Sequence, residues 1–147
     1  MDAQPEIIVL LPLYGHRNWI LVVDKAFPAL PASAGMQVIN TNSTMLPVLR
    51  YLNAKIQQSP HIFSHLYMDK ELNFIPAERD AILNQFKDSL HQIFGHQMIS
   101  PLLHDSVFTE VAETSKRYQV LVLKTNSCIA YSSIYFQLDC KYWNADK

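Results

Sequence analysis

Apolar positions along the chain follow two patterns that alternate from one segment to the next. Short, nearly continuous runs of branched and aromatic residues are typical of strands buried within a sheet. Apolar residues spaced three or four positions apart are typical of helices with one buried face. The runs predict strands at residues 19–23, 36–39, 61–68, 97–99, 119–123 and 131–138. The helical spacing predicts helices at residues 6–14, from residue 45 to Pro60, 77–94 and 105–116.

The segment 77–94 carries the clearest helical pattern. Ile82, Phe86, Leu90 and Ile93 form its predicted apolar stripe, and Gly95 follows as a helix-ending residue. The first helix is expected to end in a glycine cap at residue 15 after an irregular last turn around a proline.

Helices and strands interleave, which predicts an α/β fold with a central sheet and flanking helices. The length of 147 residues favours a single layered domain that spans residues 1–147. The hydrophobic fraction of 49% and the aromatic fraction of 11% indicate a packed core rather than disorder.

Charge excludes one class of partner. Lys and Arg number 12, Asp and Glu number 13, and the basic residues are scattered, so we expect no nucleic-acid partner. The amino-terminal stretch lacks the basic start and long apolar core of a signal peptide, and no apolar run is long enough to span a bilayer. We therefore expect a cytoplasmic protein without membrane contacts, whose two cysteines stay reduced.

Known cofactor motifs are missing. With only 3 glycines, the chain has neither a P-loop nor a dinucleotide-binding fingerprint. His61 and His65 are four residues apart, a spacing that can hold a metal on a helix, but their segment reads as a strand and offers no further ligand. We expect no cofactor and no metal requirement.

Two polar residues flank the first predicted strand. His16 precedes it, and Asp24 follows it directly. Ligands of open α/β sheets gather outside the carboxyl ends of the strands, so Asp24 is a candidate site residue, although a cap of the following turn fits it equally well. Hydroxyl residues and a tyrosine between 124 and 133 form a second polar group, which suits either a sugar or an ordinary turn.

Two stretches together resemble the D-ribose pyranase and L-fucose mutarotase family. The first is GHRNWILVVDKAFP at residues 15–28, which is similar to the family's Gly-His, polar residues, apolar strand, Asp and Pro. The second is VLKTNSCIAYSSI at residues 122–134, which resembles the family's turn and Tyr-containing segment before the last strand. The resemblance implies that the whole chain has the fold of this family.

The resemblance also implies roles for individual residues. The Gly-His histidine, here His16, would be the catalytic acid, and Asp24 would bind sugar hydroxyls. Tyr131 would also contact the sugar, with Ser133 where the family has Asn and Ser127 where it has Glu. A family His or Arg precedes a Phe by three residues, whereas His104 precedes Phe108 by four, and we expect His104 to bind substrate.

Three functions fit these residues. The first is a monosaccharide mutarotase or pyranase, an isomerase that opens and closes sugar rings by acid–base catalysis near neutral pH. The second is a non-catalytic sugar-binding or regulatory relative, which Ser127 and Ser133 suggest. The third is an aldose–ketose isomerase, which needs a base for a carbon-bound proton and often a metal.

The resemblance further implies a homo-oligomer, with ring-like decamers among the family's assemblies. Along one straight strand, His16 and Asp24 would be about 25 Å apart. One small sugar cannot contact both, so either the segment after His16 folds back or neighbouring subunits complete each site.

Overall fold

The computed structural model describes residues 2–30, 35–75 and 81–143. Its centre is one six-stranded sheet in the order β2-β5-β1-β6-β3-β4. The strands are β1 (Trp19–Val23), β2 (Met36–Asn40), β3 (Ile62–Asp69), β4 (Ile99–Leu102), β5 (Val120–Lys124) and β6 (Ile134–Cys140). β6 runs antiparallel to both of its neighbours, β1 and β3. The β1–β5, β2–β5 and β3–β4 pairs are parallel, so the other five strands share one direction.

β1 lies inside the sheet because its sequence is apolar on both faces. All five of its residues, WILVV, are buried, as expected for a strand covered from both sides. Its neighbours β5 and β6 carry similar runs of buried residues. The edge strand β2 shows no fully buried residue, since only one neighbour covers it.

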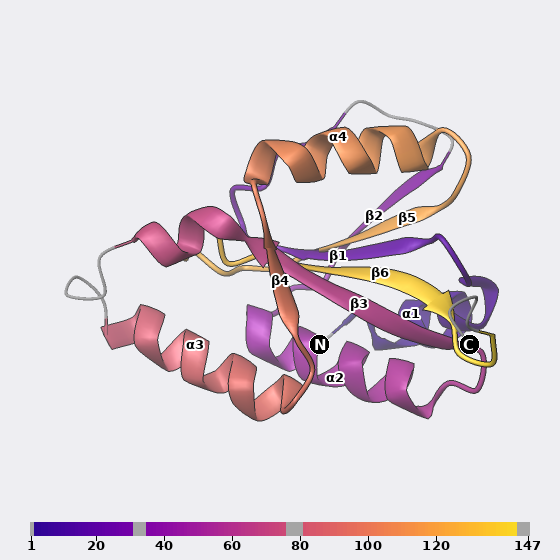
Figure 1. Ribbon diagram of the computed structural model, residues 1–147, viewed down its shortest axis with the longest axis horizontal. Helices are drawn as coiled ribbons and strands as arrows, with labels where there is room; N and C mark the ends of the chain where they lie inside the picture. Colours follow the sequence, from indigo (N-terminus) through magenta and orange to yellow (C-terminus); the bar gives the residue numbers. More distant parts are fainter. Residues whose placement is uncertain (1, 31–34, 76–80, 144–147) are drawn as a thin grey trace.

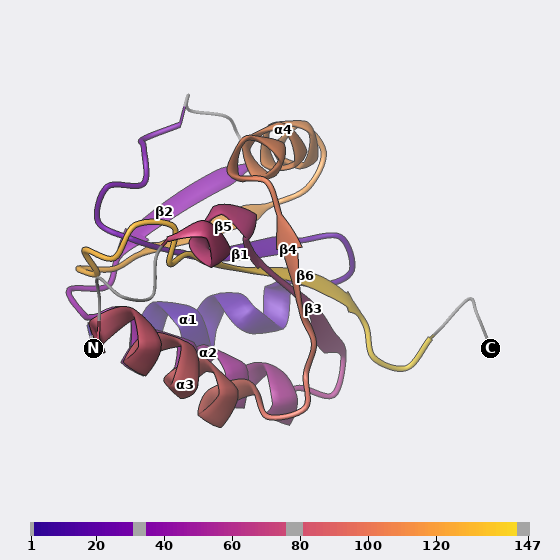
Figure 2. The ribbon, with the colours of Figure 1, turned by 60° about the vertical axis from the view of Figure 1, so that its left-hand side comes forward.

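Helices cover the two faces of the sheet unequally. α1 (Gln4–Leu10), α2 (Met45–Gln58) and α3 (Ala81–Phe94) lie on one face, and α4 (His104–Ser115) lies alone on the other (Figures 1 and 2). Short 3₁₀ turns, η1 (Leu11–Leu13) and η2 (Lys70–Phe74), follow α1 and β3. The buried apolar residues accordingly form a large cluster with α1, α2 and α3 and a smaller one that includes Val107 and Val111 of α4. Within the described part of the chain, no helix has the length and apolar character to cross a membrane.

The sequence-based boundaries hold for β1 and shift elsewhere. In α3 the buried residues are Leu83, Phe86, Leu90 and Phe94, so the predicted stripe was wrong at Ile82, whose side chain is 60% exposed, while residues 77–80 of that prediction lie outside the described residues. The true stripe is offset by one residue at each end, which the same three-and-four spacing permits.

Two further expectations were wrong for local reasons. Gly15 does not cap a helix: α1 ends at Leu10, η1 follows, and the Gly15 N–H binds the Asn18 side chain. β4 begins at Ile99 rather than ending there, and it accommodates Pro101 because it is an edge strand.

Strand direction decides which residues can meet. β1, β3, β4 and β5 end, and β6 begins, along the same side of the sheet. We call this side, formed by strand ends rather than by an outermost strand, the carboxyl edge. Asp24, Asp69 and Lys124 stand at the ends of β1, β3 and β5, and His104 follows β4 after one residue. His16 precedes β1 and Asp139 is near the end of β6, so both lie at the opposite edge, which we call the amino edge.

Candidate functional site

Asp24 is held at the carboxyl edge by the segment that precedes β6. Its backbone N–H donates to the Ser133 hydroxyl at 3.2 Å, and the backbone N–H of Lys25 donates to the Ser127 carbonyl at 2.7 Å. The Thr125 hydroxyl donates to the Val23 carbonyl at 2.7 Å. The two stretches that carry the family resemblance are therefore bonded directly to each other.

The surroundings of Asp24 act on its charge in opposite directions. Partial burial raises the pKa of the Asp24 carboxyl above its ordinary value, and this is the largest effect. Its own backbone N–H, the charges of His104 and Lys124, and a hydrogen bond with Ser133 lower the pKa in part. Such a carboxyl is suited to accept or return a proton closer to neutral pH than an exposed aspartate.

His104 is fixed at the first turn of α4 by two carboxylates. Its backbone N–H donates to both oxygens of Glu71, at 3.1 and 3.0 Å, so Glu71 of η2 caps a helix whose N-cap residue, Leu103, has no side-chain cap. Its imidazole Nδ1 is 2.9 Å from Oδ2 of Asp69. Asp69 is fully buried, while the His104 side chain remains 24% exposed, so the ring reaches from the core to the surface.

Aromatic rings surround the His104 imidazole. The Tyr131 ring meets it nearly edge-on at a centroid distance of 5.4 Å, and Phe108 does so at 4.6 Å. Phe27, from the segment after Asp24, lies at 6.3 Å. Together they give the site apolar walls beside its polar groups, a combination that suits the apolar face and the hydroxyls of a sugar.

Tyr131 adopts a strained backbone conformation. Its φ of 58° falls in the left-handed region, which costs a non-glycine residue about 1–2 kcal/mol. Its side chain stays 38% exposed beside His104. Tyr131 lies in a turn, and β6 begins only at Ile134, contrary to the sequence prediction. Strain of this kind is concentrated at functional sites.

The structure thus brings together four of the five predicted site residues. Asp24, His104, Tyr131 and Ser133 gather at the carboxyl edge from three distant parts of the chain. Asp69 and Glu71, which hold His104, were missed at the sequence level. The signal available in the sequence was the pair of carboxylates, Asp69 and Glu71, at the end of a predicted strand. It became informative only through the pairing of β3 with β6.

His16, the fifth predicted site residue, lies at the amino edge of the sheet, away from the other four. Its Nδ1 is 2.8 Å from Oδ1 of Asp139, and Nε2 of His65 is 3.0 Å from the other oxygen of the same carboxylate. The Arg17 side chain donates to Nε2 of His16 at 3.2 Å. The whole of β1, roughly 16 Å long, separates this amino-edge group from Asp24. Within one chain, the turn after His16 does not fold back toward Asp24.

His61 and His65, the pair whose spacing could hold a metal, bind different partners. Nε2 of His61 faces the carbonyls of Tyr14 and Leu11, at 2.9 and 3.3 Å, whereas His65 binds Asp139. Over the ranges that the structure describes, no three His, Cys, Asp or Glu residues are grouped so as to hold a metal ion.

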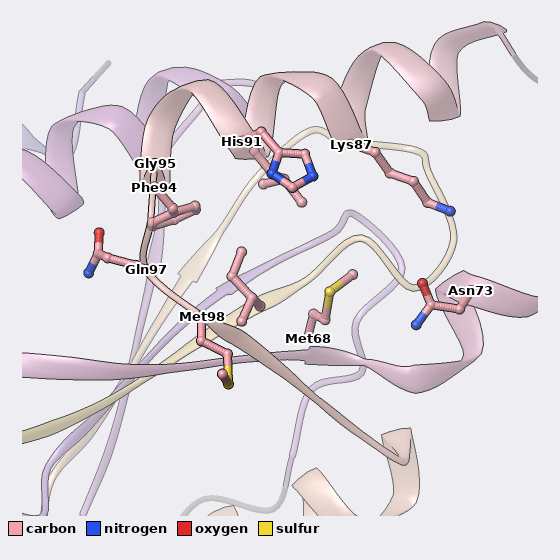
Figure 3. Close-up of a pocket in the computed structure, with 10 residues that line it drawn as sticks. Met68, Asn73, Lys87, His91, Phe94, Gly95, Gln97 and Met98 are labelled. Carbon is pink, nitrogen blue, oxygen red and sulfur yellow. The ribbon is translucent and has the colours of Figure 1, made fainter.

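A cavity of about 330 Å³ lies apart from these groups. Figure 3 shows Lys87 and His91 of α3 above it, with Met68 of β3 and Met98 below. None of the five predicted site residues lines it. A second cavity, of about 350 Å³, is closer to the candidate site because Phe27 and Lys124 contribute to its wall.

Solved structures share this architecture. Bacillus subtilis RbsD in complex with D-ribose superposes with a TM-score of 0.61, at 17% sequence identity over 91% of each chain. The Streptococcus pneumoniae fucose mutarotase in complex with L-fucose gives a TM-score of 0.63, at 16% identity over 94% of each chain. FucU from Bifidobacterium longum gives 0.60, at 14% identity over 94% of each chain. The chain has the ribose pyranase and fucose mutarotase fold.

This likeness confirms the expected fold. Residues 15–28 and 122–134, which suggested the pyranase and mutarotase fold, lie side by side on β1 and on the β5–β6 segment. No family model and no curated protein matches the sequence. The likeness therefore shows the fold alone, and the site residues have to be argued from their own geometry.

Proposed function

We propose that this protein interconverts the cyclic forms of a monosaccharide by acid–base catalysis. The observation that carries the proposal is the grouping of Asp24, His104, Tyr131 and Ser133 at the carboxyl edge. Ligands of open α/β sheets bind at this edge. The structural neighbours in complex with D-ribose and L-fucose make a pentose or a deoxyhexose the first substrates to test.

The chemistry needs only proton transfers. A base takes the proton of the anomeric hydroxyl, the bond between the anomeric carbon and the ring oxygen breaks with its electron pair on that oxygen, and an acid protonates it. Closure onto the other face, or through another hydroxyl, reverses these steps. Positioned acid–base groups typically contribute about 10²- to 10⁴-fold, which suits a reaction that already proceeds in water.

The candidate residues divide these tasks. Asp24, His104, Tyr131 and Ser133 bind the sugar, with the Asp24 carboxylate accepting hydroxyl protons in hydrogen bonds. We assign the acid to His16, as the family resemblance implies. Because β1 separates His16 from Asp24 in one chain, His16 serves the site of a neighbouring subunit in a homo-oligomer.

A non-catalytic sugar-binding protein is the second candidate. Ser127 stands where the family has Glu, and its buried hydroxyl is 3.4 Å from that of Ser132, inside the loop. Ser133 binds the backbone of Asp24 instead of offering an amide to a sugar. A site that lost these groups could keep affinity for a sugar and lose rate.

Polarimetry on freshly dissolved single anomers separates the two candidates. We expect the wild type to accelerate the approach to the equilibrium rotation for D-ribose or L-fucose, and Asp24→Asn to weaken both binding and rate. If calorimetry detects sugar binding by the wild type while the rotation changes at the buffer rate, the catalytic proposal is wrong and the binding protein replaces it.

A further inference from the structure

A buried chain of hydrogen bonds runs behind the candidate site. The Tyr135 hydroxyl donates to Oδ1 of Asp69 at 2.7 Å, and Oδ2 of Asp69 faces Nδ1 of His104 at 2.9 Å. Tyr135 and Asp69 are both fully buried, whereas His104 is partly exposed. These hydrogen bonds therefore lead from the core of the sheet to the His104 imidazole, which contacts solvent.

Tyr135 and His104 each donate a hydrogen bond to the Asp69 carboxylate. Burial together with the adjacent Asp69 strongly raises the pKa of the Tyr135 hydroxyl, so it stays protonated and donates. Burial raises the pKa of the Asp69 carboxyl, while its hydrogen bonds with Tyr135 and His104 favour the ionised form. The ionised carboxylate only accepts hydrogen bonds, so Oδ2 requires a proton on Nδ1 of His104. In the neutral ring this leaves Nε2 as the acceptor, and the structure gives Nε2 no partner among the described residues.

We propose that Asp69 is a positioning residue that fixes His104 with its proton on Nδ1, so that Nε2 accepts the proton of the anomeric hydroxyl. This rests on the proposed sugar interconversion and names the base of that reaction. Glu71 holds the backbone of the same residue, so both the place and the tautomer of the ring are set by η2 and the end of β3.

The proton balance of the step is complete. Nε2 of His104 takes the anomeric proton as the carbonyl of the open sugar forms, and the acid assigned above, His16 of a neighbouring subunit, protonates the ring oxygen that leaves the anomeric carbon. The imidazole becomes a cation whose Nδ1–H still points at Asp69. The Asp69 carboxylate stabilises that cation without becoming protonated. When the sugar closes again, the acid takes its proton back from the attacking hydroxyl and Nε2 returns the other proton to the new anomeric hydroxyl, so no other reactant is consumed.

The tautomer can be read directly in the wild type. Long-range ¹H–¹⁵N spectra distinguish a protonated ring nitrogen from an unprotonated one, and assignment by comparison with His104→Gln identifies the signals. With the neutral ring, we expect Nδ1 of His104 to carry the proton. A His104 ring protonated on Nε2 would overturn the proposal whether or not the protein acts on sugars.

Asp69→Asn then tests the effect on the reaction. An amide has one acceptor oxygen, which Tyr135 occupies, so its N–H₂ faces His104 and favours the opposite tautomer. We expect the His104 signals to exchange roles and anomer exchange to fall about 10²-fold, with sugar affinity nearly unchanged.

The double variant Asp69→Asn/Tyr135→Phe frees the amide oxygen for His104. It should restore the wild-type tautomer and recover part of the rate, and Tyr135→Phe alone should keep the tautomer. An Asp69→Asn protein with the wild-type tautomer, or with a reversed tautomer and full activity, would contradict the proposal. If the wild type shows the predicted tautomer but no sugar turnover, the proposed function fails while the assigned tautomer stands.

Discussion

Asp24 and Tyr131, both at the carboxyl edge, each lower the stability of the folded protein. Burial works against the charged form of Asp24, and Tyr131 holds a left-handed backbone conformation. Neither feature helps the chain to fold. Both residues interact with His104. Costs of this kind in neighbouring residues are expected where binding rather than stability has selected the residue.

The stability of Asp24→Asn tests this interpretation. Since the folded-state pKa of Asp24 is raised, the folded protein binds this proton more tightly than the unfolded chain, and stability falls as pH rises through the window between the two values. We expect Asp24→Asn to melt at a higher temperature than the wild type at pH 7, with the difference closing below the ordinary carboxyl value of about 3.9.

The exposed Asp88 of α3 offers the control for this experiment, because Asp88→Asn removes a charge of the same type from a solvated position. Its effect on the melting temperature should not depend on pH in the same way. A loss of stability in Asp24→Asn at pH 7 would show that the carboxylate contributes to folding instead.

His16→Gln tests the assigned acid. Glutamine keeps hydrogen-bonding capacity and approximate size but does not titrate near pH 7. We expect the fold and some sugar affinity to remain and the rate of anomer exchange to fall by about 10²-fold or more, measured by saturation transfer on folded protein. Full activity in this variant would remove His16 from the mechanism.

At the residue level, Asp24, Tyr131 and Ser133 could be predicted because they belong to the two stretches that resemble the family, whereas His104 was predicted although its spacing to Phe108 is one residue longer than in the family. Asp69 could not be predicted in this way. It ends a strand, as many solvated aspartates do, and its proposed role depends on Tyr135 and His104, which are 66 and 35 positions away. Only the tertiary pairing of β3 with β6 brings this buried carboxylate beside Tyr135.

Among the elements, β1 was predicted to the residue because its apolar run is bounded by polar residues on both sides. The start of β6 was not, because Tyr131 has a side chain typical of strands while its positive φ places its backbone in a turn. The offset stripe of α3 arises because apolar residues occur on two adjacent faces, and packing against α2 and the sheet selects between them.

The junction between β2 and α4 provides a prediction at this scale. A Cβ on Gly35 would collide with the carbonyl oxygen of Ser115 and come within 2.8 Å of that of Tyr118. We expect Gly35→Ala to lower the free energy of unfolding by about 2–4 kcal/mol in denaturant titrations.

Gly15→Ala is the matched substitution, because a Cβ there meets no atom within 4 Å. It should change stability by no more than about 0.5 kcal/mol. Equal effects of the two substitutions would mean that α4 does not approach β2 as closely as the structure shows.

For the whole molecule, the proposed joint role of His16 and Asp24 requires a partner subunit, because β1 separates the two residues within one chain. We expect light scattering to show a homo-oligomer at micromolar concentration, and a monomer would contradict the shared site. The insertion of antiparallel β6 between β1 and β3 could not be predicted from local sequence because it joins strands far apart in the chain.

Mixed oligomers test the shared site itself. Subunits with His16→Gln and subunits with Asp24→Asn are each expected to be nearly inactive alone. If each site takes His16 from one subunit and Asp24 from its neighbour, random mixing leaves about a quarter of the sites intact. Activity that stays at the level of the single variants after subunit exchange would place both residues in the site of one chain.

The central claim is that the protein accelerates the interconversion of sugar ring forms, and NMR saturation transfer between anomers measures this directly. A panel of aldoses that includes D-ribose and L-fucose should contain at least one sugar whose exchange rate rises in proportion to protein concentration, in buffer with a chelator and no added cofactor. Exchange rates equal to those in buffer for every sugar in the panel would contradict the account.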